Sequence, residues 1–193
     1  MINSKVDHCK TLEEFYEEIR RQQEEAHGDK YCEQHDIIKQ LLWNECKTYK
    51  ELGTHQGGTA ACALMQKPTK VDLVDISMEK YNKSKHLFEA YCEKHDIELV
   101  VREMDSTSPR SVSRTDLLVI DSLHSPKHLV QELNLHTQYV AKYIVCHDTS
   151  RLHGKANDAL YQVLKQFVAQ LNPWEIVDHR TDNVGVTVLK RTV

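Results

Sequence analysis

Apolar residues in the second part of the chain fall into short runs that alternate with longer segments of helical spacing. The first run begins at Tyr49, and the following runs are typical of β-strands. The predicted strands after the first cover residues 71–75, 97–102, 116–121 and 143–146, and the predicted helices between them include residues 78–93 and 126–139. Strands and helices in strict alternation predict right-handed βαβ units and a parallel sheet.

The beginning of the chain has a different pattern, with two helices and no strand. Thr11-Leu-Glu-Glu14 is a capping box, which predicts a polar helix that continues to about Ala26. Residues 27–29 (His-Gly-Asp) interrupt it. The apolar positions of the second predicted helix are Ile37, Ile38, Leu41, Leu42 and Trp43. We expect residues 1–46 to form a segment that covers the site, contributes to substrate binding or joins two copies of the chain in a homo-oligomer.

The end of the chain predicts antiparallel pairing. After a helix over residues 156–170, strands at 174–180 and 184–190 flank the short turn 181–183, which suits a hairpin. The predicted fold is therefore α/β and doubly wound, with a mostly parallel seven-stranded sheet and a C-terminal antiparallel hairpin. We expect residues 47–193 to form the ligand-binding domain.

Composition and charge narrow the classes of function. A chain of 193 residues with 40% hydrophobic content suits a single α/β domain. The net charge is −4, and no run of Lys and Arg is interleaved with aromatic residues, so nucleic acid is not the expected partner. No apolar run approaches the roughly 18 residues of a membrane span. The six scattered cysteines form no C-x-x-C pair, and no signal-peptide core is present, so we expect a reduced, cytoplasmic protein without a membrane partner.

The most informative segment for chemistry is the glycine-rich stretch Glu51-Leu-Gly-Thr-His-Gln-Gly-Gly-Thr-Ala60. An acidic residue at the end of a strand runs into a turn that opens an apolar helix, and such a turn presents backbone N–H groups to a ligand. The glycines stand at 53, 57 and 58, which matches neither G-x-G-x-x-G nor the P-loop spacing. A plain nucleotide-phosphate site is therefore disfavoured.

This stretch resembles motif I of the class I S-adenosylmethionine-dependent methyltransferases, E/D-x-G-x-x-x-G. It is most similar to the version found in small-molecule and sugar O-methyltransferases and in the cephalosporin hydroxylase family. The segments Asp116-Leu-Leu-Val-Ile-Asp-Ser-Leu-His-Ser125 and Cys146-His-Asp-Thr149 resemble two further motifs of that group. The resemblance covers residues 49–149 and extends through the hairpin at 183–189, and it implies a Rossmann-like class I methyltransferase fold.

The resemblance also implies a set of cofactor contacts. Glu51 would face the charged amino-acid end of S-adenosylmethionine, Asp75 would accept bonds from the ribose hydroxyls, and residues 105–106 would border the adenine. A solvated strand-end carboxylate and a simple Asp/Ser turn are the alternatives for Asp75 and for residues 105–106. The predicted cofactor-binding residues are Glu51, Gly53, Thr54, His55, Gly58, Asp75, Ile76, Asp105, Ser106 and Asp121.

A divalent metal and a general base complete the predicted site. Asp121, His147 and Asp148 could hold an ion that lowers the pKa of an acceptor hydroxyl, with His124 as the base that takes its proton. Magnesium and manganese are the expected ions, and the imidazole also suits another transition metal. Ordinary hydrogen-bonding roles for His124 and for the His147-Asp148 turn remain open, and His128 and His153 are further candidate bases.

The function predicted from these motifs is divalent-metal-assisted methyl transfer to a hydroxyl of a small molecule or sugar, with Asp121 and His124 as catalytic residues. Two alternatives stay open. A non-haem iron(II) oxygenase would use His124, His147 and one of the two carboxylates, Asp148 or Asp121. A non-catalytic subunit would bind S-adenosylmethionine beside another enzyme. A zinc site made from the repeated Tyr-Cys-Glu-x-His-Asp-Ile at 31–37 and 91–97 is disfavoured, because the flanking residues do not repeat.

Overall fold

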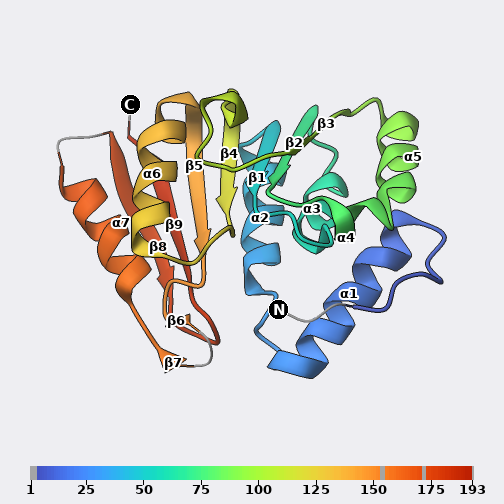
Figure 1. Ribbon diagram of the computed structural model, residues 1–193, viewed down its shortest axis with the longest axis horizontal. Coiled ribbons are helices and arrows are strands. Elements are labelled where there is room, and N and C mark those ends of the chain that lie inside the picture. Colours follow the sequence, from blue (N-terminus) through green and yellow to red (C-terminus); the bar gives the residue numbers. More distant parts are fainter. Residues whose placement is uncertain (1–3, 153–154, 171–172, 193) are drawn as a thin grey trace.

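A single mixed sheet forms the centre of the molecule. The computed structural model describes residues 4–152, 155–170 and 173–192. The strands of the sheet are β1 (Thr48–Leu52), β2 (Lys70–Asp75), β3 (Glu98–Glu103), β4 (Thr115–Ile120), β5 (Val140–His147), β8 (Trp174–Arg180) and β9 (Val186–Arg191), in the order β3-β2-β1-β4-β5-β9-β8 (Figure 1). The first five are parallel, and β9 pairs antiparallel with both β5 and β8. The predicted parallel sheet with a C-terminal antiparallel hairpin is confirmed.

Alternate residues of each central strand enter two separate cores, as the period of two in a strand requires. Tyr49 and Leu73 belong to the core beneath α1 (Leu12–His27), α2 (Glu33–Asn44), α3 (Gly58–Leu64) and α5 (Lys85–His95). Leu52 and Val74 belong to the other core, beneath α6 (Pro126–His136) and α7 (Ala159–Ala169). In Figure 1, α6 and α7 lie at the left and α1 and α5 at the right. The central strands are thus covered on both faces, as a doubly wound sheet requires.

The N-terminal helices begin and pack as their sequence indicates. The Thr11 hydroxyl accepts a hydrogen bond from the Glu14 N–H, which is the predicted helix cap. Phe15 and Ile38 are fully buried in the same core as α3 and the sheet. Trp43 is 77% exposed, so it adds nothing to that core.

Two predicted helices are wrong in extent. Residues 78–93 form two helices, α4 (Glu79–Asn82) and α5, instead of one. The break at residues 83–84 lets Tyr81 and Phe88 enter the core together, with ring centroids 4.9 Å apart, and Asn82 and Ser84 are weak helix formers. The helix predicted from residue 156 starts at Ala159, because β6 (Arg151–Leu152) and β7 (Lys155–Ala156) first form a small antiparallel pair.

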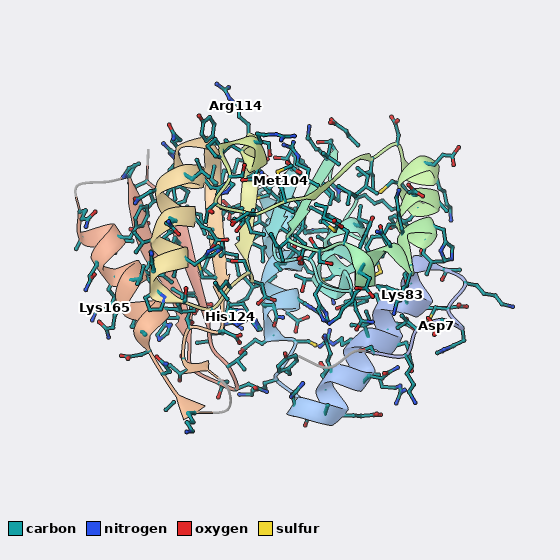
Figure 2. The ribbon with its side chains drawn as sticks, in the orientation of Figure 1. Asp7, Lys83, Met104, Arg114, His124 and Lys165 are labelled. Carbon is teal, nitrogen blue, oxygen red and sulfur yellow. The ribbon has the colours of Figure 1, made fainter. Side chains whose placement is uncertain are left out.

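The carboxyl ends of the central strands meet at one end of the sheet. Figure 2 shows Arg114, just before β4, at the upper edge of the molecule and His124, just after β4, near the lower ends of the central strands. The backbone N–H of Gly53 donates to Val74 and that of Asp121 donates to Leu52, so the loops after β1, β2 and β4 leave the sheet at the same level.

No helix in the described ranges is long and apolar enough to cross a membrane. All six cysteines are buried and free.

Candidate active site

The loop after β1 passes very close to the end of β4. Gly53 has φ +92°, a conformation that L side chains rarely adopt, and a Cβ there would lie 2.5 Å from the Asp121 carbonyl carbon and 2.7 Å from the Ser122 nitrogen. Gly57 also has positive φ, and a Cβ on it would lie 2.7 Å from the Phe88 ring. The glycine spacing noted in the sequence is therefore a packing requirement that draws Asp121 to the glycine turn.

Asp75 fixes the shape of the same turn from β2. Its carboxylate accepts hydrogen bonds from the His55 N–H at 2.8 Å and from the Ser77 N–H at 3.0 Å. His55 itself has positive φ, and its imidazole lies 2.8 Å from the Lys80 amine. Because each Asp75 oxygen keeps free lone pairs, the carboxylate can also accept bonds from a ligand.

A cavity of about 460 Å³ opens at this end of the sheet. Ile76 and Leu123 contribute apolar walls to it and are 71% and 64% exposed. Seven of the predicted cofactor residues line it: Gly53, His55, Asp75, Ile76, Asp105, Ser106 and Asp121. Apolar side chains together with a few polar groups suit a flat ring system that bears hydroxyl or amino groups.

The other three predicted cofactor residues line a smaller, polar cavity of about 20 Å³ on the far side of Gly53. They are Glu51, Thr54 and Gly58, and Tyr31 and Gln34 reach the same cavity from the N-terminal region. Glu51 is 1% exposed and accepts a hydrogen bond from Tyr49 at 3.0 Å, so its carboxyl group is enclosed by protein and not presented on an open surface. Burial raises the pKa of Glu51 well above its ordinary value.

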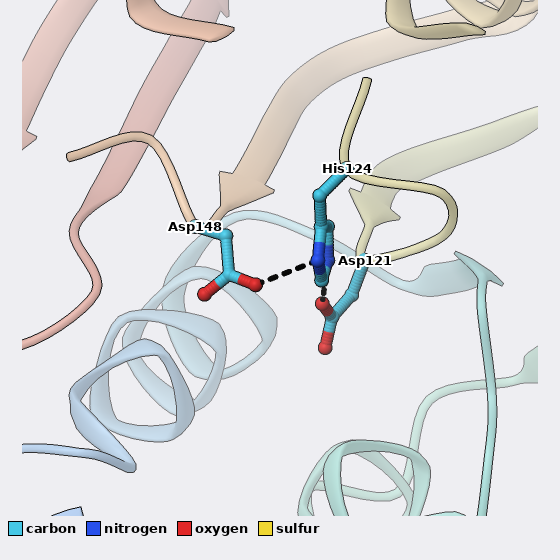
Figure 3. Close-up of side chains that lie close together, drawn as sticks. All are labelled: Asp121, His124 and Asp148. Atoms are coloured by element: carbon cyan, nitrogen blue, oxygen red, sulfur yellow. Dashed lines mark hydrogen bonds and ion pairs between the residues drawn. The ribbon is translucent and has the colours of Figure 1, made fainter. Parts of the chain in front are cut away.

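Asp121, His124 and Asp148 form a compact cluster between the ends of β4 and β5 (Figure 3). His124 Nε2 lies 3.0 Å from Asp121 Oδ1, and His124 Nδ1 lies 2.8 Å from Asp148 Oδ2. One potential ligand atom from each of the three residues lies within 4.8 Å of the other two. We call this group the Asp121–His124–Asp148 cluster.

His147 supports this cluster from the last residue of β5. Its Nδ1 lies 3.1 Å from Asp121 Oδ1 and 3.5 Å from Asp148 Oδ1, and the ring is almost fully buried. The Nε2 atom of His147 has no hydrogen-bond partner among the residues that the structure describes. Asp148 adopts φ +57°, and this backbone turn brings its carboxylate back toward His124. The three predicted metal ligands are thus brought together, with His124 inserted between the two carboxylates.

The charges of this cluster stabilise one another. Burial alone lowers the pKa of His124, but the hydrogen bonds to Asp121 and Asp148 outweigh it and raise that pKa to about 10. Burial opposes ionisation of Asp121 as well, yet His147 and His124 hold its pKa well below the ordinary range. In this arrangement His124 is an imidazolium that donates from both nitrogens, and it has no lone pair with which to take a proton.

Several residues of the site were not predicted from the sequence. Ser122 and Leu123 line the large cavity beside His128, which was a candidate base, and the buried Glu132 lies on α6 behind it. An acidic residue in the apolar stripe of a helix was the available signal for Glu132. His153, a candidate base, lies outside the described residues.

The strand order and the antiparallel hairpin define a class I methyltransferase fold. No protein-family model and no curated protein matches the sequence. Among solved structures, the chain is similar to the S-adenosylhomocysteine-bound methyltransferase PaMTH1 of Podospora anserina, at 17% identity and TM-score 0.59, covering 93% of this chain and 87% of that one. It is also similar to TomG of Streptomyces achromogenes, an O-methyltransferase of tomaymycin synthesis in complex with S-adenosylmethionine, at 15% identity and TM-score 0.56, covering 83% and 80%.

A third similar structure is the ribosomal protein L11 methylase of Lactobacillus delbrueckii subsp. bulgaricus, at 14% identity and TM-score 0.60, covering 86% and 80%. Its acceptor is a protein, as its name says. At these identities the likeness shows the fold, and function has to be argued from the site.

Proposed function

We propose that this chain transfers the methyl group of S-adenosylmethionine to a hydroxyl of a small molecule or sugar, assisted by a divalent cation. The observation that carries the proposal is the position of the Asp121–His124–Asp148 cluster. Asp121 lines the large cavity with six other predicted cofactor contacts and also belongs to the cluster. A methyl donor bound in the cavity would therefore place its methyl group near this cluster, whose side chains can activate an acceptor hydroxyl.

The cofactor part of the proposal rests on the two cavities. Asp75 has free lone pairs for ribose hydroxyls, and Ile76 and Leu123 could lie on either side of a purine. Thr54 and Gln34 each have a buried side-chain oxygen with no hydrogen-bond partner in the described part of the chain, and both line the small polar cavity. Such groups favour a ligand with polar ends, since a buried unpaired oxygen costs about 1–3 kcal/mol.

The donor set of Asp121, Asp148 and the adjoining His147 fits a divalent cation. Two carboxylates and one imidazole suit manganese or another transition metal better than an all-oxygen site would, and magnesium remains a candidate. A bound ion would polarise the acceptor hydroxyl and lower its pKa. Asp121, His147 and Asp148 would hold the ion, and His124, which lies against both carboxylates, would stay off it as the candidate base.

His124 remains our candidate for the base, because a neutral imidazole has a single lone pair and could not use it both to bind the ion and to take a proton. When both ring nitrogens of His124 donate to Asp121 and Asp148, the ring has no lone pair, so base action requires that one of these two contacts opens. Asp121 and Asp148 keep the ring oriented both when the two contacts are closed and when one of them is open. The acceptor is proposed to be a metabolite hydroxyl because the chain carries a net charge of −4 and its sequence has no run of Lys and Arg interleaved with aromatic residues.

Calorimetry and turnover assays test the proposal. The chain should bind S-adenosylhomocysteine, and it should bind Mn²⁺ in a manner that Asp148→Asn abolishes. Asn tolerates positive φ, so this variant removes the charge without straining the turn. Asp29→Ala, an exposed carboxylate far from the cluster in sequence, serves as the matched control. S-Adenosylhomocysteine formation should follow addition of catechol or sugar acceptors and should stop in excess chelator.

Three outcomes contradict parts of this proposal. Binding of NADH but of neither sulfur compound would overturn the methyltransferase function. Full turnover in excess chelator would remove the ion from the reaction. Oxygen consumption with Fe²⁺ would favour the oxygenase alternative, for which His124, His147 and the two carboxylates supply suitable ligands.

A further inference from the structure

A buried carboxylate on α6 joins the two loops that form one wall of the large cavity. Glu132 is 1% exposed, and its Oε1 accepts hydrogen bonds from Ser106 Oγ at 2.5 Å and from Ser122 Oγ at 2.6 Å. Ser106 belongs to the loop after β3 and Ser122 to the loop after β4. Both serines line the cavity, whereas Glu132 lies behind them.

His128 lies one helical turn before Glu132 and joins the same network. Its Nε2 is 3.0 Å from Ser106 Oγ and 3.3 Å from Glu132 Oε1. The backbone N–H of His128 is also held, because it donates to the Ser125 hydroxyl that caps α6. The imidazole is therefore fixed on its Nε2 side and at its backbone.

Counting hydrogens assigns the tautomer of His128. Burial raises the pKa of Glu132, but with its carboxylate ionised each serine hydroxyl directs its one proton to Oε1 through these short contacts. The contact between Ser106 Oγ and His128 Nε2 then needs a proton from the imidazole, so Nε2 carries the hydrogen. In the neutral ring this leaves Nδ1 with a lone pair.

The lone pair of Nδ1 is available to a ligand. His128 lines the cavity, and Nδ1 has no partner among the contacts of the described residues. Asp105 lines the same cavity and carries a second acceptor, a carboxylate that already takes the Thr107 N–H at 2.8 Å. The cavity therefore offers two acceptors, and a ligand that meets them has to present N–H or O–H donors.

We propose that His128 recognises the exocyclic amino group of a 6-aminopurine and that Glu132 is the positioning residue that fixes its tautomer. This inference rests on the proposed function, since it identifies how the cofactor cavity selects its base. A 6-oxopurine would set a carbonyl oxygen against the Nδ1 lone pair. It would lose a hydrogen bond and bury two facing acceptors, which corresponds to about a 10-fold or greater loss of affinity.

The experiment compares two ligands that differ at C6 and in the hydrogen on the adjacent N1. S-Adenosylhomocysteine and its deaminated form, S-inosylhomocysteine, are titrated by calorimetry into the wild type, His128→Ala and Glu132→Gln. The wild type should bind the amino form about 10-fold or more tightly. The ratio should fall toward one in His128→Ala. The affinity ratio should also fall in Glu132→Gln. The Gln amide can donate to Nε2, which allows the His128 hydrogen to move to Nδ1 and removes the acceptor there. His86→Ala, an exposed histidine on α5, is the matched control and should keep the wild-type ratio.

A second measurement observes the tautomer itself. Long-range ¹H–¹⁵N spectra of the unliganded wild type should show the His128 proton on Nε2, and Glu132→Gln should redistribute it; this readout depends neither on turnover nor on the stability of a variant. If the wild type binds S-adenosylhomocysteine but discriminates equally well after His128→Ala, the inference is wrong while the proposed function stands. If the wild type binds neither ligand, the proposed function fails first.

Discussion

Replacing Gly53 with Ala should destabilise the fold by moving the end of β1 away from the end of β4. Residue 53 adopts φ +92°, which costs an L side chain roughly 1–2 kcal/mol. The new Cβ would meet the backbone of Asp121 and Ser122, which cannot rotate away as a side chain would, and overpacking of this kind costs about 1–3 kcal/mol. Gly53→Ala should therefore lower the free energy of unfolding by about 2–5 kcal/mol.

Gly28→Ala provides the control within the same chain. Gly28 has φ +99°, but the nearest atom to its added Cβ is Asn183 Nδ2 at 3.9 Å, an ordinary contact. This variant should lose only the backbone contribution, about 1–3 kcal/mol, because φ +99° with ψ 159° is a conformation essentially restricted to glycine. Urea denaturation followed by far-ultraviolet circular dichroism gives both values. Equal destabilisation of the two variants would refute the reasoning, because the close approach of the glycine turn to Asp121 would then carry no energetic weight.

Further predictions concern the ligand and the titrating groups. Asp75→Ala should weaken S-adenosylhomocysteine binding by about 10- to 150-fold, because it removes charge-assisted hydrogen bonds to the ligand and the acceptor of the His55 N–H. The control variant Glu175→Ala on β8 should leave binding unchanged. Equal affinity in both variants would exclude a ribose role for Asp75. Burial lowers the pKa of His35 to about 3 and that of His136 to about 4. Below about pH 6.5 the unfolded chain therefore binds more protons than the folded one. The free energy of unfolding should fall as the pH drops below about 6.5, by up to about 1.4 kcal/mol per pH unit for each group. The raised pKa of His124 acts in the opposite direction: its contribution is complete below about pH 6.5 and is lost as the pH rises toward 10. Unfolding midpoints should therefore be highest near pH 6.5, with His136→Gln flattening the acid limb and His124→Gln the alkaline limb; stability that rises steadily up to about pH 9 would contradict both assignments.

Much of the fold follows from local pattern. The alternation of strand and helix and the hairpin at the end of the chain predict the sheet, because each depends on short-range spacing that packing does not override. Asp75, Asp121 and Asp148 were located for a similar reason: they end or follow strands, and parallel strands bring those ends together.

The features that depend on tertiary contacts could not be predicted from the sequence. The break before α5 arises because Tyr81 and Phe88 share one core, which no local propensity encodes. The insertion of His124 between two carboxylates depends on the positive φ of Asp148. The network around Glu132 joins three separate segments, and the burial of Glu51 depends on Tyr49 and the N-terminal helices. Motifs supplied the residue types of the site, and packing determined their partners.

The pairing of β5 with β9 also bears on the order in which the molecule can assemble. His147 pairs with Val186, and Thr149 is fully buried against Thr187, with their hydroxyls 2.9 Å apart. This contact joins residues 39 positions apart, from His147 to Val186, whereas β1 and β4, whose following loops meet at Gly53 and Asp121, pair across 68 positions from Tyr49 to Leu117. Because closing a longer loop costs more entropy, the pairing of β1 with β4 should close more slowly than that of β5 with β9. The glycine turn should then reach Asp121 late in folding, after β9 has fixed His147.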